Sequence, residues 1–222
     1  MKIAYVCTNY NNSRLTLDAI ESLHRDPEHA FLSVVVDNQS TEENRRILEE
    51  FARDRKDVRV IWSPENIGYF PGLNLGLRQA RQLMPDLDFM VIGNNDLLFP
   101  PSFAQQLQSV LKKANPHPVL SPDIITLDHQ HQNPHVIKGI SRFREVVYDV
   151  YHAHYWLAAL IQKLAKWSHA ITDRSDEQAW QVPQFIHQGY GACYILTPRF
   201  WDHFEELWAP TFLMGEEYFL SK

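Results

Sequence analysis

The chain has 222 residues, of which 45% are apolar, and a formal net charge of −6 at pH 7. This length and composition are enough to bury one sizeable core, so we expect a single globular domain over residues 1–222. The negative charge argues against a general nucleic-acid surface, because binding a polyanion without sequence preference requires clustered lysine and arginine side chains.

Short apolar runs alternate with segments of helical period along the first half of the chain. This alternation is typical of α/β proteins with a largely parallel sheet. Strands are predicted over residues 2–7, 31–37, 57–62 and 88–93. Helices are predicted over residues 13–24, from Thr41 onward, 73–84 and 102–113. Ser40 and Glu43 form an S-x-x-E capping box before the second helix, and Pro101 stands where a first helical residue is expected.

After about residue 115 the alternation loosens. Residues 118–125 are strand-like, residues 128–135 form a polar loop rich in histidine, and residues 144–167 are helical in composition. The run over 192–197 predicts a further strand, and Pro198 is expected to begin a helix that carries Phe200, Phe204 and Leu207.

Polar residues follow three of the predicted strands. In open α/β sheets ligands bind at the carboxyl ends of the strands, so these residues are candidate ligand contacts. They are Thr8 and Asn9, Asp37 and Asn38, and Asn94, Asn95 and Asp96. A carboxylate and amide oxygens at a strand end suit Mg²⁺ or Mn²⁺, and such a cation would hold a diphosphate. The alternative is that Asp96 and Asp37 only shape turns, which Asp commonly does.

Glycines recur every fourth residue in the segment 63–80, at Gly68, Gly72 and Gly76. They surround a loop that enters a helix, where backbone can approach a ligand closely. The spacing is neither G-x-G-x-x-G nor G-x-x-x-x-G-K-[ST], which argues against a nicotinamide enzyme and a P-loop phosphotransferase.

Five segments in order resemble motifs of family 2 glycosyltransferases of the rhamnosyltransferase-like kind. VVVDNQSTEEN resembles V-V-D-N-x-S-x-D, ENIGYFPGLNLGLRQA resembles N-x-G-F-x-x-G-x-N-x-G, and VIGNNDLLFPPSF resembles the strand that ends in a D-x-D-like element. GYGACYILTPRFW and FLMGEEYFLSK resemble the strand before the acceptor-side helix and the G-E-D segment. The resemblance implies an α/β fold of the GT-A type, with a mostly parallel central sheet flanked by helices and a small acceptor-side β/α region. Residues 1–115 would bind the nucleotide sugar, and residues 116–222 would form the acceptor side.

The resemblance also implies roles for individual residues. Asp37 would contact the nucleotide base, Asp96 would bind the metal, and Glu217 would be the general base, with Glu216 beside it as the other candidate. The remaining donor-side contacts would be Thr8, Asn9, Asn38, Asn66, Gly68, Asn74, Asn94 and Asn95. His187, Gly189 and Gly191 would lie on the acceptor side.

The sequence departs from the family pattern at two positions. Asn94 stands where a full D-x-D has its first acid, and Glu217 stands where the family has Asp. Glu216 and Glu217 can also be explained without catalysis, because acids are common in the first turn of a helix.

Some features allow more than one interpretation. His129, His131 and His135 lack the ligand spacing of a zinc site and indicate a solvated loop. His187 is either near the acceptor or a core histidine. Residues 148–167 have aromatic and lysine side chains that suit either a membrane surface or packing on the sheet. The chain stops five residues past Glu217 without a Gly or Pro stop signal, which indicates a truncated form.

The location of the protein is predicted from what the sequence lacks. No stretch reaches the roughly 18 uncharged apolar residues that cross a bilayer, and the first residues lack the apolar region of a signal peptide. Cys7 and Cys193 each lie in an apolar run and are expected to be buried free thiols. We therefore expect a cytoplasmic protein, with peripheral contact at the inner face of the membrane as an option.

The function implied is inverting transfer of a sugar from a nucleotide diphosphate sugar to a hydroxyl of a glycan or lipid-linked acceptor, with Mg²⁺ or Mn²⁺ at Asp96. The alternative is a non-catalytic nucleotide-sugar-binding or assembly subunit with a degenerate metal site. A nucleotidyltransferase would need a glycine-rich loop near the N-terminus, and KIAYVCTNYNNSR contains none.

Overall fold

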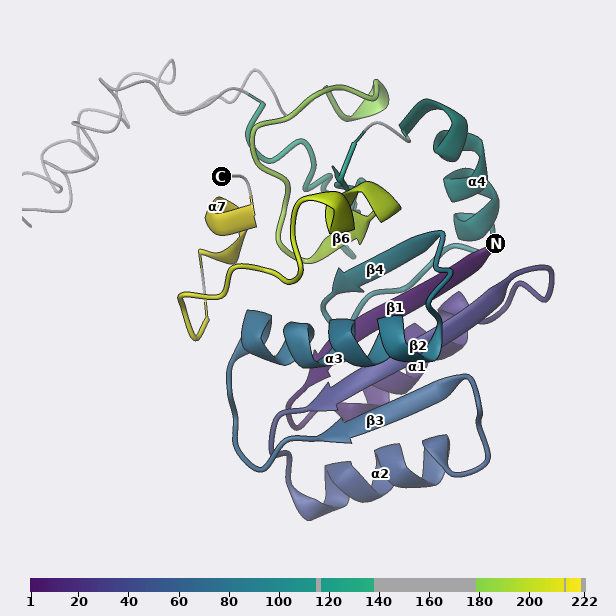
Figure 1. Cartoon of the computed structure of the whole chain (residues 1–222), viewed down its shortest axis with the longest axis vertical. Helices are drawn as coiled ribbons and strands as arrows, with labels where there is room; N and C mark the ends of the chain where they lie inside the picture. Colours follow the sequence, from purple (N-terminus) through teal and green to yellow (C-terminus); the bar gives the residue numbers. More distant parts are fainter. Residues whose placement is uncertain (115–116, 138–178, 214, 221–222) are drawn as a thin grey trace, which may run out of the picture. The chain divides into compact units, whose positions relative to one another are not determined.

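The computed structural model describes residues 1–114, 117–137, 179–213 and 215–220 (Figure 1). The chain divides into two compact units, one formed by Met1–Ile124 with Tyr190–Lys222 and the other by Ile125–Gly189. Whether these units form the single domain expected from the sequence stays a prediction. The helix expected over 144–167, and with it the aromatic segment 148–167, lies outside the described residues.

The first unit contains a six-stranded sheet in the order β3-β2-β1-β4-β6-β5. The strands are β1 Lys2–Asn9, β2 Ala30–Asp37, β3 Val58–Trp62, β4 Phe89–Gly93, β5 Val119–Leu120 and β6 Cys193–Leu196. The first four are parallel, whereas β6 runs antiparallel to both β4 and β5. The predicted mostly parallel sheet is therefore confirmed.

Helices cover both faces of this sheet, as Figure 1 shows for α3 in front of the strands and α1 behind them. The helices are α1 Ser13–Leu23, α2 Glu42–Ala52, α3 Tyr69–Leu83, α4 Phe103–Ala114 and α7 Glu216–Leu220, with short 3-10 helices η2 Ala179–Gln181 and η3 Pro198–Asp202. Side chains of α1, α2 and α4 pack with Ile3 and Tyr5 of β1, and those of α3 and η3 pack with Ala4 and Val6. Alternate residues of one buried strand thus supply two separate cores.

Helix α3 begins at Tyr69, four residues before the predicted start, so the predicted position of that start is wrong. Gly72, which was placed before the helix, lies inside it together with Gly76. A Cβ at Gly76 would lie 2.3 Å from Cγ1 of Val6, and a Cβ at Gly72 would lie 2.7 Å from Cγ2 of Thr8. Both glycines therefore allow close packing of the helix on the sheet.

The predicted capping box of α2 is also wrong. The N-cap is Thr41, and no side chain there makes a capping hydrogen bond. The hydroxyl of Ser40 accepts hydrogen bonds from the side chain of Asn9 and the backbone N–H of Asn11 instead. The Ser40 hydroxyl that a capping box would have used is therefore engaged in tertiary hydrogen bonds.

Other boundaries shift as well. Helix α4 starts at Phe103, after Pro101, and only two residues of the predicted strand 118–125 pair in the sheet. The helix after Pro198 is a 3-10 helix that ends at Asp202, so Phe204 and Leu207 lie beyond it. Leu207 is nevertheless buried, whereas Phe204 is half-exposed.

Both cysteines are buried and free, as predicted. Burial raises the pKa of Cys7 and that of Cys193 to about 12, so both thiols stay protonated and unreactive. In the described part of the chain, no helix has the length and apolar character needed to span a bilayer.

Candidate functional site

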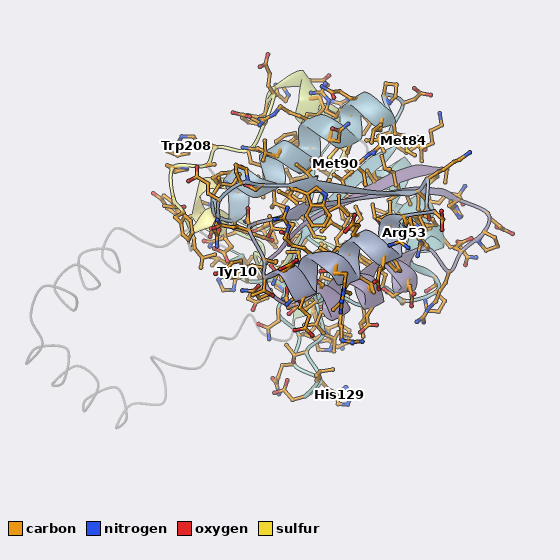
Figure 2. The ribbon with its side chains drawn as sticks, turned by 90° about the horizontal axis from the view of Figure 1, so that it is seen from below. Tyr10, Arg53, Met84, Met90, His129 and Trp208 are labelled. Carbon is orange, nitrogen blue, oxygen red and sulfur yellow. The ribbon has the colours of Figure 1, made fainter. Side chains whose placement is uncertain are left out.

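The sheet register brings the predicted strand-end residues to one edge. Asn9 pairs with Asp37 across β1 and β2, and Cys7 pairs with Gly93 across β1 and β4. The residues after these strands consequently gather at the carboxyl end of the sheet. Figure 2 shows Tyr10 at this end, whereas Arg53 and Met84, which close α2 and α3, lie at the other.

Asn9 lies at the centre of a buried hydrogen-bond network. Its side-chain nitrogen donates to Oδ1 of Asp37 at 2.9 Å and to Oγ of Ser40 at 3.0 Å. Its side-chain oxygen accepts from the Thr16 hydroxyl at 2.8 Å. The other oxygen of Asp37 accepts from the backbone N–H of Ser40 at 3.0 Å, and Nε of Arg45 lies 3.9 Å from it.

Asp37 is 0% exposed and both of its oxygens have partners. This geometry supports the alternative that Asp37 organises a turn and ties β2 to β1. Its contact with a nucleotide base stays a prediction.

Two side chains that follow β4 differ in exposure: the amide of Asn95 is buried and the carboxylate of Asp96 is exposed. Asn95 is buried and its side chain donates to Oδ1 of Asn12 and Oγ1 of Thr16, both at 2.7 Å. Asp96 is exposed, and among the described residues its carboxylate has no hydrogen-bond partner. The backbone of Asn94 donates to the carbonyl of Ala192 at 2.9 Å, which connects this edge to the start of β6.

Within the described ranges, no three His, Cys, Asp or Glu side chains come together as a metal site. Asp96 is therefore a lone exposed carboxylate. Mg²⁺ is commonly bound by one or two carboxylates plus substrate phosphates and water, so this donor set fits a cation that arrives with a diphosphate.

The loop before α3 is held from two sides. Asn66 accepts the backbone N–H of Gly68 at 3.1 Å, and the carbonyl of Gly68 accepts the side-chain N–H of Asn38 at 2.9 Å. Gly68 has a φ of 93°, and a Cβ there would lie 2.3 Å from the carbonyl oxygen of Phe212. Only glycine fits this position, because both the backbone conformation and the space exclude a side chain. The buried Oδ1 of Asn38 has no partner among the described residues.

Asn74 is turned toward the C-terminal segment. It is buried, its side-chain N–H donates to the carbonyl of Leu207 at 2.8 Å, and its side-chain oxygen accepts the N–H of Leu207 at 2.9 Å. Both ends of the amide are occupied by backbone. Its predicted part in the donor pocket stays a prediction.

Glu216 and Glu217 begin α7. The side chain of Glu217 packs directly on Gly191, where an added Cβ would lie 2.3 Å from Oε1. Glu217 is half-buried, whereas Glu216 is 5% exposed and its Oε1 has no partner in the described part of the chain. Since Gly191 immediately precedes Ala192, the acid pair and the end of β4 approach the same edge of the sheet.

Two phenols accompany the acids. Burial raises the pKa of Tyr69 well above its usual range, and burial followed by the charge of Glu217 raises that of Tyr194. The Tyr69 hydroxyl lies 3.5 Å from the carbonyl oxygen of Gly191. Both phenols stay neutral at physiological pH, so the carboxylates are the groups here that can accept a proton.

The remaining predicted residues lie in the second unit. His187 is exposed, which excludes the core-histidine alternative, and its backbone N–H donates to the carbonyl of Val136 at 2.8 Å. Gly189 is buried. His129 is exposed, and the ring of His131 stacks on Trp180 with centroids 3.8 Å apart.

One candidate escaped the sequence analysis. Tyr10 is 55% exposed directly after β1, at the same edge as Asp96. The strand-end rule that selected Thr8 and Asn9 would have included it if the strand had been extended to Asn9, where it ends in the structure.

Three comparisons with known proteins bear on this site. A model described as "Glycosyl transferase family 2" matches residues 6–166, and a search of the curated proteins finds no match. Solved structures include S. aureus TarS 1-349, alone and with UDP-GlcNAc, each 20% identical with a TM-score of 0.47; the match covers 64% of this chain and 39% and 37% of those chains.

A mannosyltransferase from Pyrobaculum calidifontis, solved with GDP-Man and Mn²⁺, is 15% identical with a TM-score of 0.54. The match covers 99% of this chain and 50% of that one, so this chain spans at most about half the length of these solved structures. At this identity the likeness concerns the fold alone, and it confirms the predicted GT-A-like arrangement. Because the family model covers more than half of the residues, the chain belongs to glycosyl transferase family 2.

Proposed function

We propose that this chain transfers a sugar from a nucleotide diphosphate sugar to a hydroxyl group, with inversion at the anomeric carbon. Family membership supports the reaction class. The observation that carries the proposal is the pairing of β4 with β6, since it joins the strand before Asp96 to the strand that follows Gly191, on which Glu217 packs. A donor bound at Asp96 and an acceptor bound at Glu217 would then lie along the same edge of the sheet.

Glu217 is the proposed general base. Its carboxylate takes the proton of the acceptor hydroxyl while that oxygen forms a bond to the anomeric carbon. The bond from the anomeric carbon to the diphosphate oxygen breaks, and the electron pair leaves with the nucleoside diphosphate. Glu217 is favoured over Glu216 because its side chain is more exposed, whereas Glu216 is almost fully buried.

A divalent cation is proposed at Asp96, the exposed carboxylate after β4. Bound Mg²⁺ or Mn²⁺ would offset the negative charge that develops on the leaving diphosphate. The buried network of Asn9 and Asp37 would keep the adjoining strand ends rigid. The acceptor class, a glycan or a lipid-linked saccharide, and the cytoplasmic location with peripheral membrane contact stay predictions.

A non-catalytic binding subunit is the second candidate. It is favoured by the lone carboxylate at the proposed metal position, because the described residues supply no cluster of three ligands there. Such a protein would bind nucleotides without releasing nucleoside diphosphate from a nucleotide sugar.

The test uses Glu217→Gln and Glu216→Gln, each of which removes a charge and keeps the shape of the side chain. Hydrolysis of UDP-glucose, GDP-mannose and TDP-glucose, with water in place of the acceptor, is measured with Mn²⁺. We expect Glu217→Gln to lose about 10²-fold or more in kcat, the usual contribution of a general base, and Glu216→Gln to lose less. Full activity in both variants would contradict the mechanism, and nucleotide binding without turnover by the unmodified chain would favour the binding subunit.

A further inference from the structure

The segment from Leu207 to Phe212 is fastened along α3 at both ends. Leu207 forms the two hydrogen bonds with the Asn74 side chain, and the carbonyl of Phe212 accepts the backbone N–H of Tyr69 at 2.9 Å. We call residues 207–212 the strap. It runs from the interior of α3 back to the first residue of that helix.

Asn74 is the side chain that fixes one end of the strap. An amide that donates to a carbonyl and accepts from the N–H of the same residue replaces the two backbone hydrogen bonds that a neighbouring strand would give. Asn74 is 5% exposed and Leu207 is 2% exposed, so water does not substitute for these bonds. The contact joins positions 133 residues apart in the sequence.

Glu216 and Glu217, the acid pair, follow the strap closely in the sequence. Glu216 follows Phe212 by four residues, and the backbone N–H of Tyr218 donates to the carbonyl of Gly215 at 3.0 Å as α7 begins. Burial is the main cause of the raised pKa of Tyr69, the residue that holds Phe212, and the charge of Glu216 is a smaller one. The attachment of the strap and the location of the carboxylates are therefore connected over a short stretch of chain.

We propose that Asn74 is a positioning residue, which holds the strap through Leu207 and thereby sets where the carboxylates of Glu216 and Glu217 stand at the sheet edge. This inference rests on the proposed function for its kinetic consequence. It gives Asn74 a role that differs from contact with the donor, because both ends of its amide form hydrogen bonds with Leu207.

The structure supplies a matched control on the same two elements. Nη1 of Arg78 lies 2.6 Å from Oε2 of Glu206, which joins α3 to the residue before the strap, but both side chains are about half-exposed. Exposed ion pairs of this kind contribute little. Leu48, the buried residue of α2 on the other face of the sheet, supplies a second control for general loss of stability.

The experiment compares Asn74→Ala and the nearly isosteric Asn74→Asp with Arg78→Ala and Leu48→Ala, all below their melting temperatures. Amide hydrogen exchange is measured over residues 205–213 and 215–220. Hydrolysis of UDP-glucose, GDP-mannose and TDP-glucose and the thermal shift given by UDP, GDP and TDP are measured with Mn²⁺.

We expect faster exchange in both stretches for the Asn74 variants alone, and a fall in kcat of roughly tenfold or more with nucleotide binding unchanged, since small displacements of a catalytic group are costly. Faster exchange that stops before Glu216, or an equal loss of kcat in Leu48→Ala, would overturn the inference. Absence of turnover in the unmodified chain would contradict the proposed function, whereas the exchange result would still decide whether Asn74 positions the acid pair.

Discussion

Each end of β2 carries a cluster of polar side chains, and in both clusters these side chains are hydrogen-bonded to one another. At the carboxyl end, Asp37 is hydrogen-bonded to Asn9. At the amino end, Oδ2 of Asp57 lies 2.7 Å from Nδ1 of His24, and Nε2 of His24 lies 2.9 Å from Oγ of Ser33. This is the Asp-His-Ser order of hydrolase triads. Ser33 is nevertheless 0% exposed, so no substrate can reach it.

The comparison shows that a chemically suggestive constellation is not sufficient for a site. In both clusters the buried groups satisfy one another, which is the usual condition for burying polar atoms. The carboxyl end differs because it also has accessible groups, namely the exposed Asp96 and Tyr10 and the half-buried Glu217. We therefore propose that these accessible groups act on the substrates and that the networks beneath them contribute stability.

Apart from removal of the Glu217 carboxylate itself, the largest effect on activity is expected from Gly191→Ala. The new Cβ would lie 2.3 Å from Oε1 of Glu217, and the flexible end of that side chain can move aside. We expect roughly a 100-fold loss of turnover, because a displacement of about 1 Å can cost that much, with little change in melting temperature.

A double-mutant cycle tests whether this loss acts through Glu217. If it does, Gly191→Ala should cause almost no further loss in a Glu217→Ala background, because effects that share one group are not additive. Equal losses in both backgrounds would show that Gly191 acts by another route.

Asn9→Ala tests the claim that the network at the carboxyl end is structural. The change leaves Oδ1 of Asp37 and the hydroxyl of Thr16 short of a partner, at a cost of about 1–3 kcal/mol for a buried unsatisfied group. Ser33→Ala at the amino end should cost less, roughly 0.5–1.5 kcal/mol for one hydrogen bond. Urea unfolding measures both, and an unchanged midpoint for Asn9→Ala would refute the structural role.

The smallest expected effect is on the pH dependence of the unfolding free energy, and it concerns the cluster at the amino end of β2. Burial lowers the pKa of His24 from its usual value near 6.5, although the hydrogen bond to Asp57 opposes this. The unfolded chain therefore binds the proton more readily, so the contribution of His24 is present above pH 6.5 and is lost as pH falls through that value toward the folded pKa. His24→Gln should flatten the fall in unfolding free energy below pH 7, whereas the exposed His203→Gln should not.

Asp57 does not interfere with that measurement. Burial raises its pKa, but hydrogen bonds from Arg55 and His24 outweigh this and lower the pKa overall. Its stabilising contribution is thus lost only in the acid range below the usual carboxylate pKa of about 4. A slope that is unchanged in His24→Gln between pH 7 and 5 would contradict the assignment to His24.

Much of the sheet could be predicted because buried parallel strands are continuous apolar runs, as VVVD and FMVIG illustrate. The errors occur where a distant contact outweighs a local pattern. Gly72 was placed before the predicted helix, since the reason for a glycine there, the close approach to Thr8, is a tertiary contact. The hydrogen bonds of Asn74 with Leu207 are likewise a distant contact that the sequence does not reveal, while its donor role, implied by the family resemblance, stays a prediction.

For the candidate site, the strand-end position indicated Asp96, and the family resemblance implied Glu217; the roles of both stay predictions. The contact of Glu217 with Gly191 and the burial of Glu216 required the pairing of β6 with β4, which is antiparallel and joins distant segments.

The most direct test of the account is a thermal-shift panel of UDP, GDP and TDP, each with and without Mn²⁺, on the unmodified chain and Asp96→Ala. A ligand that binds the folded state raises its melting temperature by mass action. The account predicts that one nucleotide stabilises the chain in a Mn²⁺-dependent way and that Asp96→Ala abolishes this dependence without lowering the melting temperature of the free protein. No shift with any nucleotide, or a shift that is indifferent to Asp96, would contradict it.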